Sequence, residues 1–472
     1  MSAALTGAGP GPGASPARGY WVLLAAALVL AFFVHPVAAL ALLAFTALQV
    51  VRPLDFPATY LMVVTGASFV NYTRGRLTFE LSLLSVLMGF MLLTYTLRRD
   101  RRLVALQVSP LLKPLLPYLA LTLFNFVRGV AAGNSLRYAG LELLAALALG
   151  STILVANQFK QRDLKLALGW LWVTALGHSA LGFYIYSILK VRTGSIYFTP
   201  IPGVVAVVMF NFALRARSTK SAALWVLAFL PLLLHQFLSF TRGYWLSIMV
   251  SMIFSIVVHA WRRPDWGVRL RRAGFLLSTL VGLGLLGAMV LAVVYGIRGL
   301  GELALSRLSS STGTSYSFET SSNIVRLVEA AKVIGEILKA PIQGHGLGYS
   351  FTVREPIHLK LIEQWFCHEN YLLVWVKQGL IGLALFVWTL FAAVRTGLKA
   401  WRHEDSFTQS WCVGAAAATV YVLVYNLVHF PLAEVNTTFT IALLWGGAMA
   451  LTSKDWHVWT WGRASGAEAE RP

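Results

Sequence analysis

His368 lies where a long polar segment of the sequence gives way to an apolar one. The segment 297–365 before it is rich in polar residues, and the run that follows from Tyr371 is almost entirely apolar. An imidazole at a boundary between membrane and water could accept a proton during a reaction on a lipid-anchored substrate. The alternative is an interfacial histidine that only caps the helix re-entering the membrane.

Arg242 is the second residue suited to chemistry. It occurs in the stretch LSFTRGYWLSIMV, between two apolar segments with almost no loop. A guanidinium at the lipid boundary is costly unless an anion or an acidic partner meets it, and its fork of donors matches the oxygens of a phosphate. Gly243 would let backbone or substrate come close. A side chain that snorkels to the lipid head groups is the alternative.

Arg326 falls in a helix that we predict inside the polar segment. Apolar residues over 324–338 recur at three- and four-residue spacing, which indicates an amphipathic helix. Its predicted ends are a cap at Ser321 or Ser322 and a stop at Pro341. Arg326 would then lie in the first turn, where the helix dipole disfavours a cation and an anionic ligand would explain it. A surface salt bridge to Glu329 or Glu302 would explain it equally well.

A glycine-rich stretch, QGHGLGY at residues 343–349, follows the predicted helix. Its glycine spacing resembles a phosphate-binding loop only loosely, because no Lys-Ser/Thr pair follows. We expect a tight turn that folds the polar segment over the membrane surface, with His345 in a structural role.

The elements that must position these residues are membrane helices. The chain is 57% hydrophobic and only 12% charged, whereas soluble domains carry about a quarter charged residues. Several apolar segments approach or exceed the roughly 20 residues that cross a bilayer as a helix, and no long stretch alternates as the strands of a membrane β-barrel do. The sequence therefore predicts an all-α polytopic membrane protein with 12–14 transmembrane helices and one large external loop containing short helices.

Basic clusters between the apolar runs set the predicted topology. They recur after about every second span, as cytoplasmic loops do, so the net charge of +20 does not indicate a nucleic-acid partner. The predicted spans are 19–34, 37–51, 56–71, 78–97, 110–128, 136–157, 166–189, 197–214, 221–239, 243–261, 273–296, 366–394, 408–430 and 437–452. The predicted regions are a disordered cytoplasmic tail at 1–18, membrane helices at 19–296, the external loop at 297–365, membrane helices at 366–452 and a cytoplasmic tail at 453–472. Cys367 and Cys412, at or in membrane segments, suggest no disulfide framework.

Several basic residues fall on the external side in this topology, although short external loops normally avoid them. They are Arg74, Arg76, Arg128, Arg137, Lys190, Arg192 and Arg242. Together they suggest an external basin for an anion such as phosphate, in which Arg74, Arg76, Arg137 and Arg192 would bind substrate. Errors in the topology or snorkelling side chains are the alternative for any one of them.

The order of these motifs resembles the bacterial O-antigen ligase and O-antigen polymerase superfamily. The marks of that superfamily are Ser/Thr-Arg-Gly at the outer end of a span, an arginine-bearing helix in a large periplasmic loop, a Pro-x-x-Gly-x-Gly-x-Gly turn, and His-x-x-x-Leu leading into Gly-x-x-Gly. The matching residues here are Thr241-Arg242-Gly243, Arg326, Pro341 with the glycines through Gly348, His368 with Leu372, and Gly379 with Gly382. The resemblance covers residues 221–395. Glu369 and Lys377 depart from it, since Asn or Ser usually follows the histidine and glutamate often stands at the second position.

The resemblance implies an inverting glycosyltransferase in the bacterial inner membrane, with its active site facing the periplasm. The donor would be a glycan on undecaprenyl diphosphate, held by Arg242 and Arg326 as negative charge builds on the leaving diphosphate. His368 would accept the proton of the acceptor hydroxyl, and Tyr371 or Glu369 would bind substrate or orient the imidazole. The resemblance implies no metal and no other cofactor.

The resemblance leaves the acceptor open. A ligase would transfer the glycan to a glycolipid, a polymerase would transfer it to another lipid-linked repeat, and some relatives glycosylate proteins. A transporter or flippase for an anionic lipid or solute is a different possibility. It would also explain external arginines, and it predicts charged groups within the membrane, for which Glu142, Lys377 and Glu434 are candidates.

Overall fold

The computed structural model describes residues 56–69, 103–104, 109–189, 199–239, 241–261, 274, 318–354, 361–401, 403–452 and 458–459. The chain forms two compact units, residues 1–63 with 72–101 and residues 64–71 with 102–472. Helix α3 (Phe56–Phe69) contains the described residues of the first unit. The remaining elements belong to the second unit.

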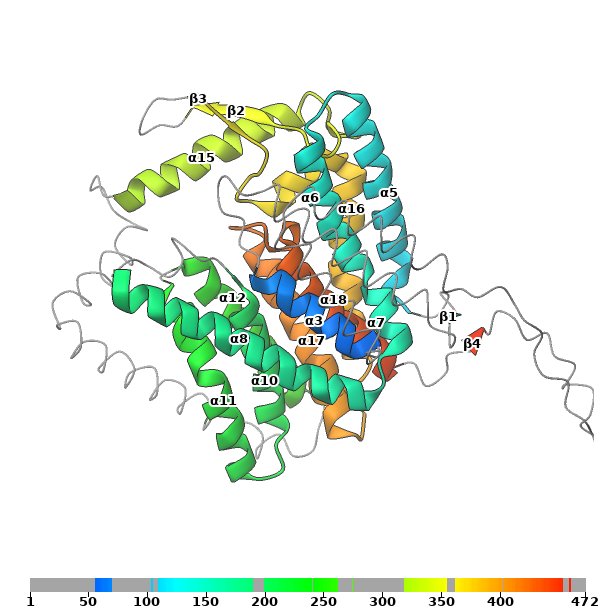
Figure 1. Cartoon of the computed structure of the whole chain (residues 1–472), viewed down its shortest axis with the longest axis vertical. Helices are drawn as coiled ribbons and strands as arrows, with labels where there is room; N and C mark the ends of the chain where they lie inside the picture. The colour runs from blue at the N-terminus through cyan, green and yellow to red at the C-terminus, as the bar shows by residue number, and fades with distance from the viewer. Residues whose placement is uncertain are drawn as a thin grey trace, which may run out of the picture. The chain divides into compact units, whose positions relative to one another are not determined.

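Helices dominate the second unit (Figure 1). Before the loop they are α5 (Leu112–Ala131), α6 (Leu136–Gly150), α7 (Thr152–Gln158), α8 (Gln161–Leu189), α10 (Ile201–Arg215), α11 (Thr219–Leu238) and α12 (Arg242–Ala260). After it they are α16 (Asn370–Leu398), α17 (Ser406–Tyr425), the 3-10 helix η1 (Pro431–Ala433) and α18 (Val435–Thr452). Strand β1 (Leu103–Val104) pairs antiparallel with β4 (Val458–Trp459). Of the two, β4 lies inside the predicted C-terminal tail.

Within the described residues, 8 helical segments are long and apolar enough to cross a membrane, with α6 and α7 counted as one segment. The prediction of an all-α polytopic membrane protein is therefore confirmed. The predicted spans 19–34, 37–51, 78–97 and 273–296 lie outside the described residues, apart from Gly274. The expected tail at 1–18 lies outside them too.

The described residues of the polar loop form a long helix and a hairpin, whereas the sequence predicts short helices. Helix α15 (Phe318–Ile337) is followed by strands β2 (Phe351–Arg354) and β3 (Leu361–Gln364), which pair antiparallel. Three predictions about this helix are wrong. It begins before Ser321 and Ser322, so neither is its cap, and Arg326 therefore lies beyond the first turn. It ends at Ile337, because a hydrogen-bonded turn intervenes before Pro341.

The loop is tied to the membrane helices by a small apolar core. Val333 and Ile337 of α15 pack with Phe351 of β2, Cys367, and Val376 of α16. Figure 1 shows α15 and the hairpin beside the ends of α6 and α16. Helix α15 packs against α16. The buried face of α15 is therefore held next to the residues that precede α16 in the chain.

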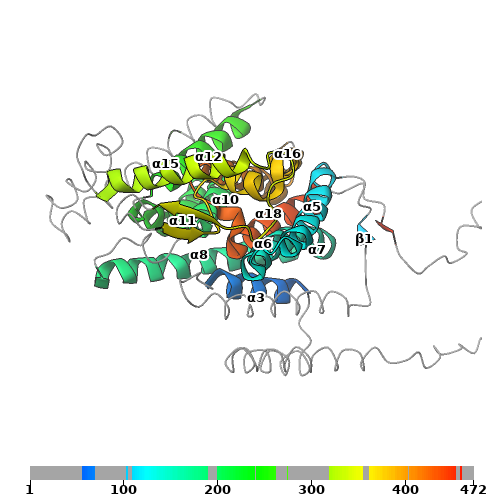
Figure 2. The same ribbon diagram turned by 90° about the horizontal axis from the view of Figure 1, so that it is seen from above.

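Helices α17 and α18 form the centre of the second unit. The spanning windows of these two helices are 78% and 83% buried, against 33% to 61% for the other candidate spans. In the view from above, α18 lies between α8 and α16 (Figure 2). The residues that connect α17 to α18 are therefore surrounded by other helices and can be held rigidly.

Candidate active site

His368 forms a hydrogen bond with a residue of the loop helix. Its Nδ1 lies 2.6 Å from Oε2 of Glu329 on α15. The His368 side chain is 28% exposed and that of Glu329 only 1%, so the carboxylate is buried and the imidazole reaches the surface. A carboxylate can only accept, so Nδ1 carries the proton in this pair and Nε2 keeps its lone pair for a substrate.

The second carboxylate oxygen of Glu329 makes no hydrogen bond to the described residues. This atom, Oε1, is buried. A buried carboxylate is costly unless a positive group compensates it, so this group favours any positive charge that forms on His368. The arrangement can therefore hold the imidazole in one tautomer.

The two residues expected to orient the imidazole do not do so. The Tyr371 hydroxyl donates to the Leu423 carbonyl at 2.9 Å, and Glu369 accepts from Cys367 Sγ at 3.0 Å. That part of the expectation is wrong, because these groups serve the packing of α16 against α17 and the local turn. Sequence reasoning treated Glu329 only as a surface partner of Arg326. The available signal was its spacing with Val333 and Ile337, which puts a carboxylate on the buried face of α15.

His429 is a second histidine at this site that the sequence analysis missed. It follows α17, and its ring centroid lies 6.4 Å from that of His368. It stacks between Tyr425 at 5.1 Å and Phe430 at 4.5 Å. Burial lowers the pKa of His429 to about 3, and the charges of His368 and Arg326 add to the effect. His429 is therefore neutral at physiological pH, so its ring packs near His368 without adding a charge to the site.

Arg326 belongs to the same group of side chains. It is one turn before Glu329 on α15 and is partly buried, and its charge acts on His429. The structure therefore places Arg326 close enough for its charge to act on His429, from the interior of the helix rather than from its first turn.

Arg242 reaches the same end of the helices from α12. It is the first residue of that helix. A side chain at the next position, Gly243, would place its Cβ 2.5 Å from Val428 and 3.1 Å from Tyr425. Tyr244 stacks on Tyr425 with ring centroids 4.6 Å apart. The glycine thus allows α12 to begin directly against the end of α17, next to the residues that contact His368.

The other predicted arginines are distributed differently. Arg137 is exposed at the start of α6, where the neighbouring Tyr138 stacks on Trp365, with ring centroids 5.0 Å apart. Arg74, Arg76, Lys190 and Arg192 lie outside the described residues. Arg128 does not belong to an anion basin, because its guanidinium donates to the carbonyls of Gln343 and Gly344 and to Asn125. It holds the glycine turn.

The glycine turn is bound to a kink in α16. Gly379 has φ of 71°, which interrupts the helix. The carbonyls of Val376 and Lys377 are thereby free to accept from the backbone N–H groups of His345 and Gly346, at 2.9 and 2.8 Å. A Cβ on Gly346, whose φ is 89°, would lie 2.6 Å from the Gly129 Cα. The glycines of both motifs therefore serve one close contact between loop and membrane helices, and this supports the structural role expected of the turn.

His345 takes part in that scaffold. Its Nε2 lies 2.9 Å from the Glu336 carbonyl oxygen, and its ring stacks on Tyr349 with centroids 4.1 Å apart. The contacts match the structural role expected for this residue.

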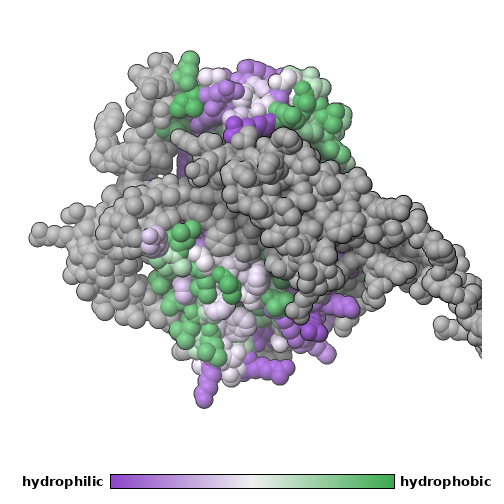
Figure 3. Space-filling model, viewed as in Figure 1, coloured by the Kyte–Doolittle hydropathy of each residue, from purple (hydrophilic) through white to green (hydrophobic). Residues whose placement is uncertain are grey.

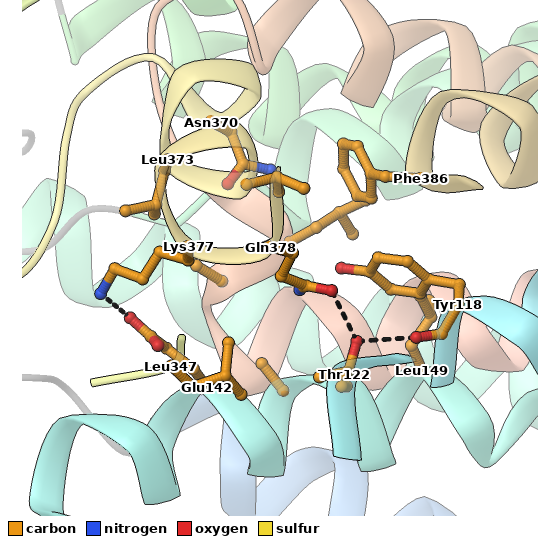
Figure 4. A pocket seen from close by; sticks show the side chains of 15 residues that line it. Tyr118, Thr122, Glu142, Leu149, Leu347, Asn370, Leu373, Lys377, Gln378 and Phe386 are labelled. Carbon is orange, nitrogen blue, oxygen red and sulfur yellow. Dashed lines mark hydrogen bonds and ion pairs between the residues drawn. The ribbon is translucent and has the colours of Figure 1, made fainter. Parts of the chain in front are cut away.

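Lys377, one of the departures from the family pattern, forms a buried ion pair with Glu142 of α6 (Figure 4). Its Nζ also donates to the Trp365 carbonyl at 2.6 Å, and Glu142 accepts from the Gly348 N–H at 2.9 Å. The pair lines a cavity of about 50 Å³ between α5, α6 and α16. Here the positive charge is on α16 and the acid on α6, and together they clamp the residues just before His368.

Glu434 is the third charged residue considered for transport. It lies between η1 and α18, accepts from Thr437 Oγ1 at 3.3 Å, and is buried. Burial raises its pKa to about 8, so the carboxyl is protonated and neutral at physiological pH. The candidates for transported charge are thus one internal ion pair and one neutral acid.

Comparison with known proteins agrees with this geometry. The family described as O-Antigen ligase matches residues 227–387, which include Arg242, α15, the glycine turn and His368. No curated protein matches the chain significantly. The resemblance inferred from the motifs is therefore confirmed over residues 227–387, which are similar to the O-Antigen ligase family.

Proposed function

We propose that this protein is an inverting glycosyltransferase that moves a glycan from a polyprenyl diphosphate to an acceptor hydroxyl. The observation that carries the proposal is the pair of His368 with the buried Glu329 at 2.6 Å, in a region matched by the ligase family. A base held in one tautomer by a buried carboxylate is what activation of a hydroxyl requires.

The proposed step is a single displacement. His368 Nε2 accepts the proton of the acceptor hydroxyl as its oxygen attacks the anomeric carbon of the donor sugar. The bond from that carbon to the diphosphate oxygen breaks, so undecaprenyl diphosphate leaves with the bonding electron pair. Attack opposite the leaving group inverts the configuration. Glu329 stabilises the imidazolium that forms.

Arg326 and Arg242 would offset the charge on the leaving diphosphate, a role that guanidinium groups perform through paired donors. With these cations the step as proposed needs no metal. Arg74, Arg76, Arg137 and Arg192 remain proposals for binding donor or acceptor phosphates. Glu369 and Tyr371 remain proposals for substrate contacts, although each already makes an internal hydrogen bond.

We further propose that the site faces the periplasm from the inner membrane. Nucleotide sugars are absent there, and a donor activated by a lipid diphosphate suits that location. The loop 297–365 would then supply the catalytic helix, and the spans at 19–296 and 366–452 would supply the membrane frame. The acceptor would be a glycolipid for a ligase or a second lipid-linked glycan for a polymerase.

Turnover by purified protein tests the proposal. We expect His368→Ala to lose at least about 10²-fold in rate with a polyprenyl-diphosphate glycan donor, the usual contribution of a positioned base. His403→Ala, before α17 at the opposite end of the helices, is the matched control and should keep full activity. Full turnover by His368→Ala would refute the mechanism. The acceptor that the wild type consumes separates ligase from polymerase.

Transport is the alternative function, and the family match does not favour it. It would replace the transferase if proteoliposomes moved labelled donor across the bilayer and formed no glycosidic product.

A further inference from the structure

A second pocket lies at the end of the helices opposite His368. It has a volume of about 430 Å³. The start of α8, the end of α10, the start of α11 and the start of α17 surround it. Helix α17 runs from this pocket to the residues beside His429 over 20 residues, or about 30 Å at 1.5 Å per residue. This distance equals the thickness of the hydrocarbon core of a bilayer, so the pocket is separate from the candidate active site.

The polar lining of the pocket suits an anion. Lys165, Arg215 and Arg217 supply positive charge. The hydroxyl donors are Ser221, Ser406 and Ser410. No carboxylate is among the described residues that line it. A phosphate group is the ligand that such a set of ammonium, guanidinium and hydroxyl donors fits.

Two acids close in sequence to the lining residues make local hydrogen bonds. Asp405 Oδ2 accepts from the Thr408 backbone N–H at 2.8 Å and from Gln161 Nε2 at 2.6 Å. Asp163 accepts from the Lys160 backbone N–H at 2.9 Å. These carboxylates cap the starts of α17 and α8, and neither belongs to the lining of the pocket.

The other wall of the pocket is apolar and aromatic. Phe212 lies between Trp225 and Phe407, with ring centroids 5.0 and 5.5 Å away. Lys165 Nζ lies 5.6 Å from the centre of the Phe407 ring. Tryptophan beside a basic residue at a helix end is typical of the membrane–water interface.

Exposed leucines continue from the pocket along α11. Leu224 and Leu227 are 67% and 59% exposed. On the face shown in Figure 3, hydrophobic residues are interspersed with residues of intermediate hydropathy over the described lower helices. Hydrophilic residues gather at the lower edge, where Figure 1 places the start of α11. An anionic group in the pocket would therefore have an apolar surface beside it for acyl chains, which a free phosphate would not use.

We propose that this pocket binds the phosphate head group of an acidic membrane phospholipid, with its acyl chains on the leucine face of α11. Basic pockets between membrane helices recognise such lipids. The bound lipid would join α8, α10, α11 and α17, and so stabilise the bundle. The proposal is independent of the glycosyltransferase function.

Thermal unfolding of the purified full chain in a neutral detergent tests it. We expect phosphatidylglycerol to raise the Tm by several degrees, since a ligand that binds only the folded state stabilises it. Phosphatidylcholine and inorganic phosphate at equal concentration should give no comparable shift. Lys165→Gln with Arg217→Gln should abolish most of the shift, whereas Lys220→Gln, an exposed cation of α11 outside the pocket, should retain it.

Three outcomes would overturn the proposal. An undiminished shift in the double variant would show that the lipid binds elsewhere. An equal shift with phosphatidylcholine would show that the anionic group is not recognised, and an equal shift with inorganic phosphate would show that the ligand is not a lipid. If the double variant does not fold, Arg217→Gln alone replaces it, because Arg217 is exposed and its loss leaves the packing intact.

Discussion

The pair of Glu329 and His368 gives the most specific prediction about catalysis. Replacing Glu329 by Gln keeps the shape of the side chain and removes its charge. The wild-type carboxylate lies 2.6 Å from Nδ1 and is 1% exposed, so it acts on the imidazolium with little intervening water. If the proton transfer to His368 limits the rate, the loss of this charge should raise the barrier directly.

The magnitude follows from Coulomb's law. Opposite charges about 4 Å apart attract by about 4 kcal/mol at an effective dielectric constant near 20. Because the His368 side chain is 28% exposed, solvent screens part of this, and about 2–3 kcal/mol remains. Such a rise in the barrier lowers kcat by about 10²-fold. KM for the lipid-linked donor should change little, since Glu329 contacts the histidine rather than the donor.

The assay compares kcat and KM of purified wild type, Glu329→Gln and Glu329→Asp with one donor and one acceptor. Glu329→Asp keeps the charge and should recover part of the activity. Glu363→Gln is the control, because this exposed loop carboxylate bonds Ser350 at 2.5 Å and does not contact the histidine. The reasoning fails if Glu329→Gln retains the wild-type kcat, or if the loss appears only in KM.

Three further predictions concern stability and are measured by unfolding in detergent. Lys377→Ala leaves Glu142 buried and unpaired, so it should lower the free energy of unfolding by about 3–5 kcal/mol. The charge-free pair Glu142→Gln with Lys377→Met should recover most of that loss. A single variant as stable as the wild type would argue against the ion pair. Gly346→Ala should lose about 2–4 kcal/mol, because it combines a positive φ with a contact of 2.6 Å to Gly129, and an unchanged Tm would contradict the close approach. Burial raises the pKa of Glu434 from 4.5 to about 8, so the folded state keeps a proton that the unfolded state loses. Stability from this group is complete below pH 4.5 and should fall by about 1.4 kcal/mol per pH unit up to about pH 8. Glu434→Gln should remove that slope. Parallel plots of unfolding free energy against pH for the wild type and Glu434→Gln would contradict the raised pKa of Glu434.

Close contacts between loop and membrane helices explain why glycines recur in this part of the chain. Gly346 allows the turn to approach α5, and Gly379 opens α16 to receive its N–H groups. Both are needed for the same contact, because the kink supplies the carbonyls and the turn supplies the donors. The spacing of the glycines suggested a turn, but it did not show that the turn docks on a broken helix.

The sequence by itself predicted the class of the protein and candidate residues for its site. The length of an apolar run and the position of a basic cluster are local properties of the sequence. The spans at α5, at α6 with α7, and at α11, α12, α17 and α18 are therefore predicted to within about five residues. The amphipathic spacing of α15 and the motif around His368 are local as well, and they suggested Arg326 and His368 as candidate site residues and the resemblance to the O-antigen ligase family.

Only the tertiary structure decided which groups meet. Glu329 and His368 are 39 residues apart in sequence, and Glu142 and Lys377 are 235 apart. Local periodicity carries no information about such pairings, since they depend on how α15 and α6 pack against α16. The sequence suggests Glu329 as a surface partner of Arg326, whereas in the structure it binds His368. The sequence likewise suggests Arg128 as an anion ligand, whereas in the structure it donates to carbonyls of the glycine turn. The packing of distant elements determines which oppositely charged residue lies beside each buried charge. A buried charge is stable only next to such a partner.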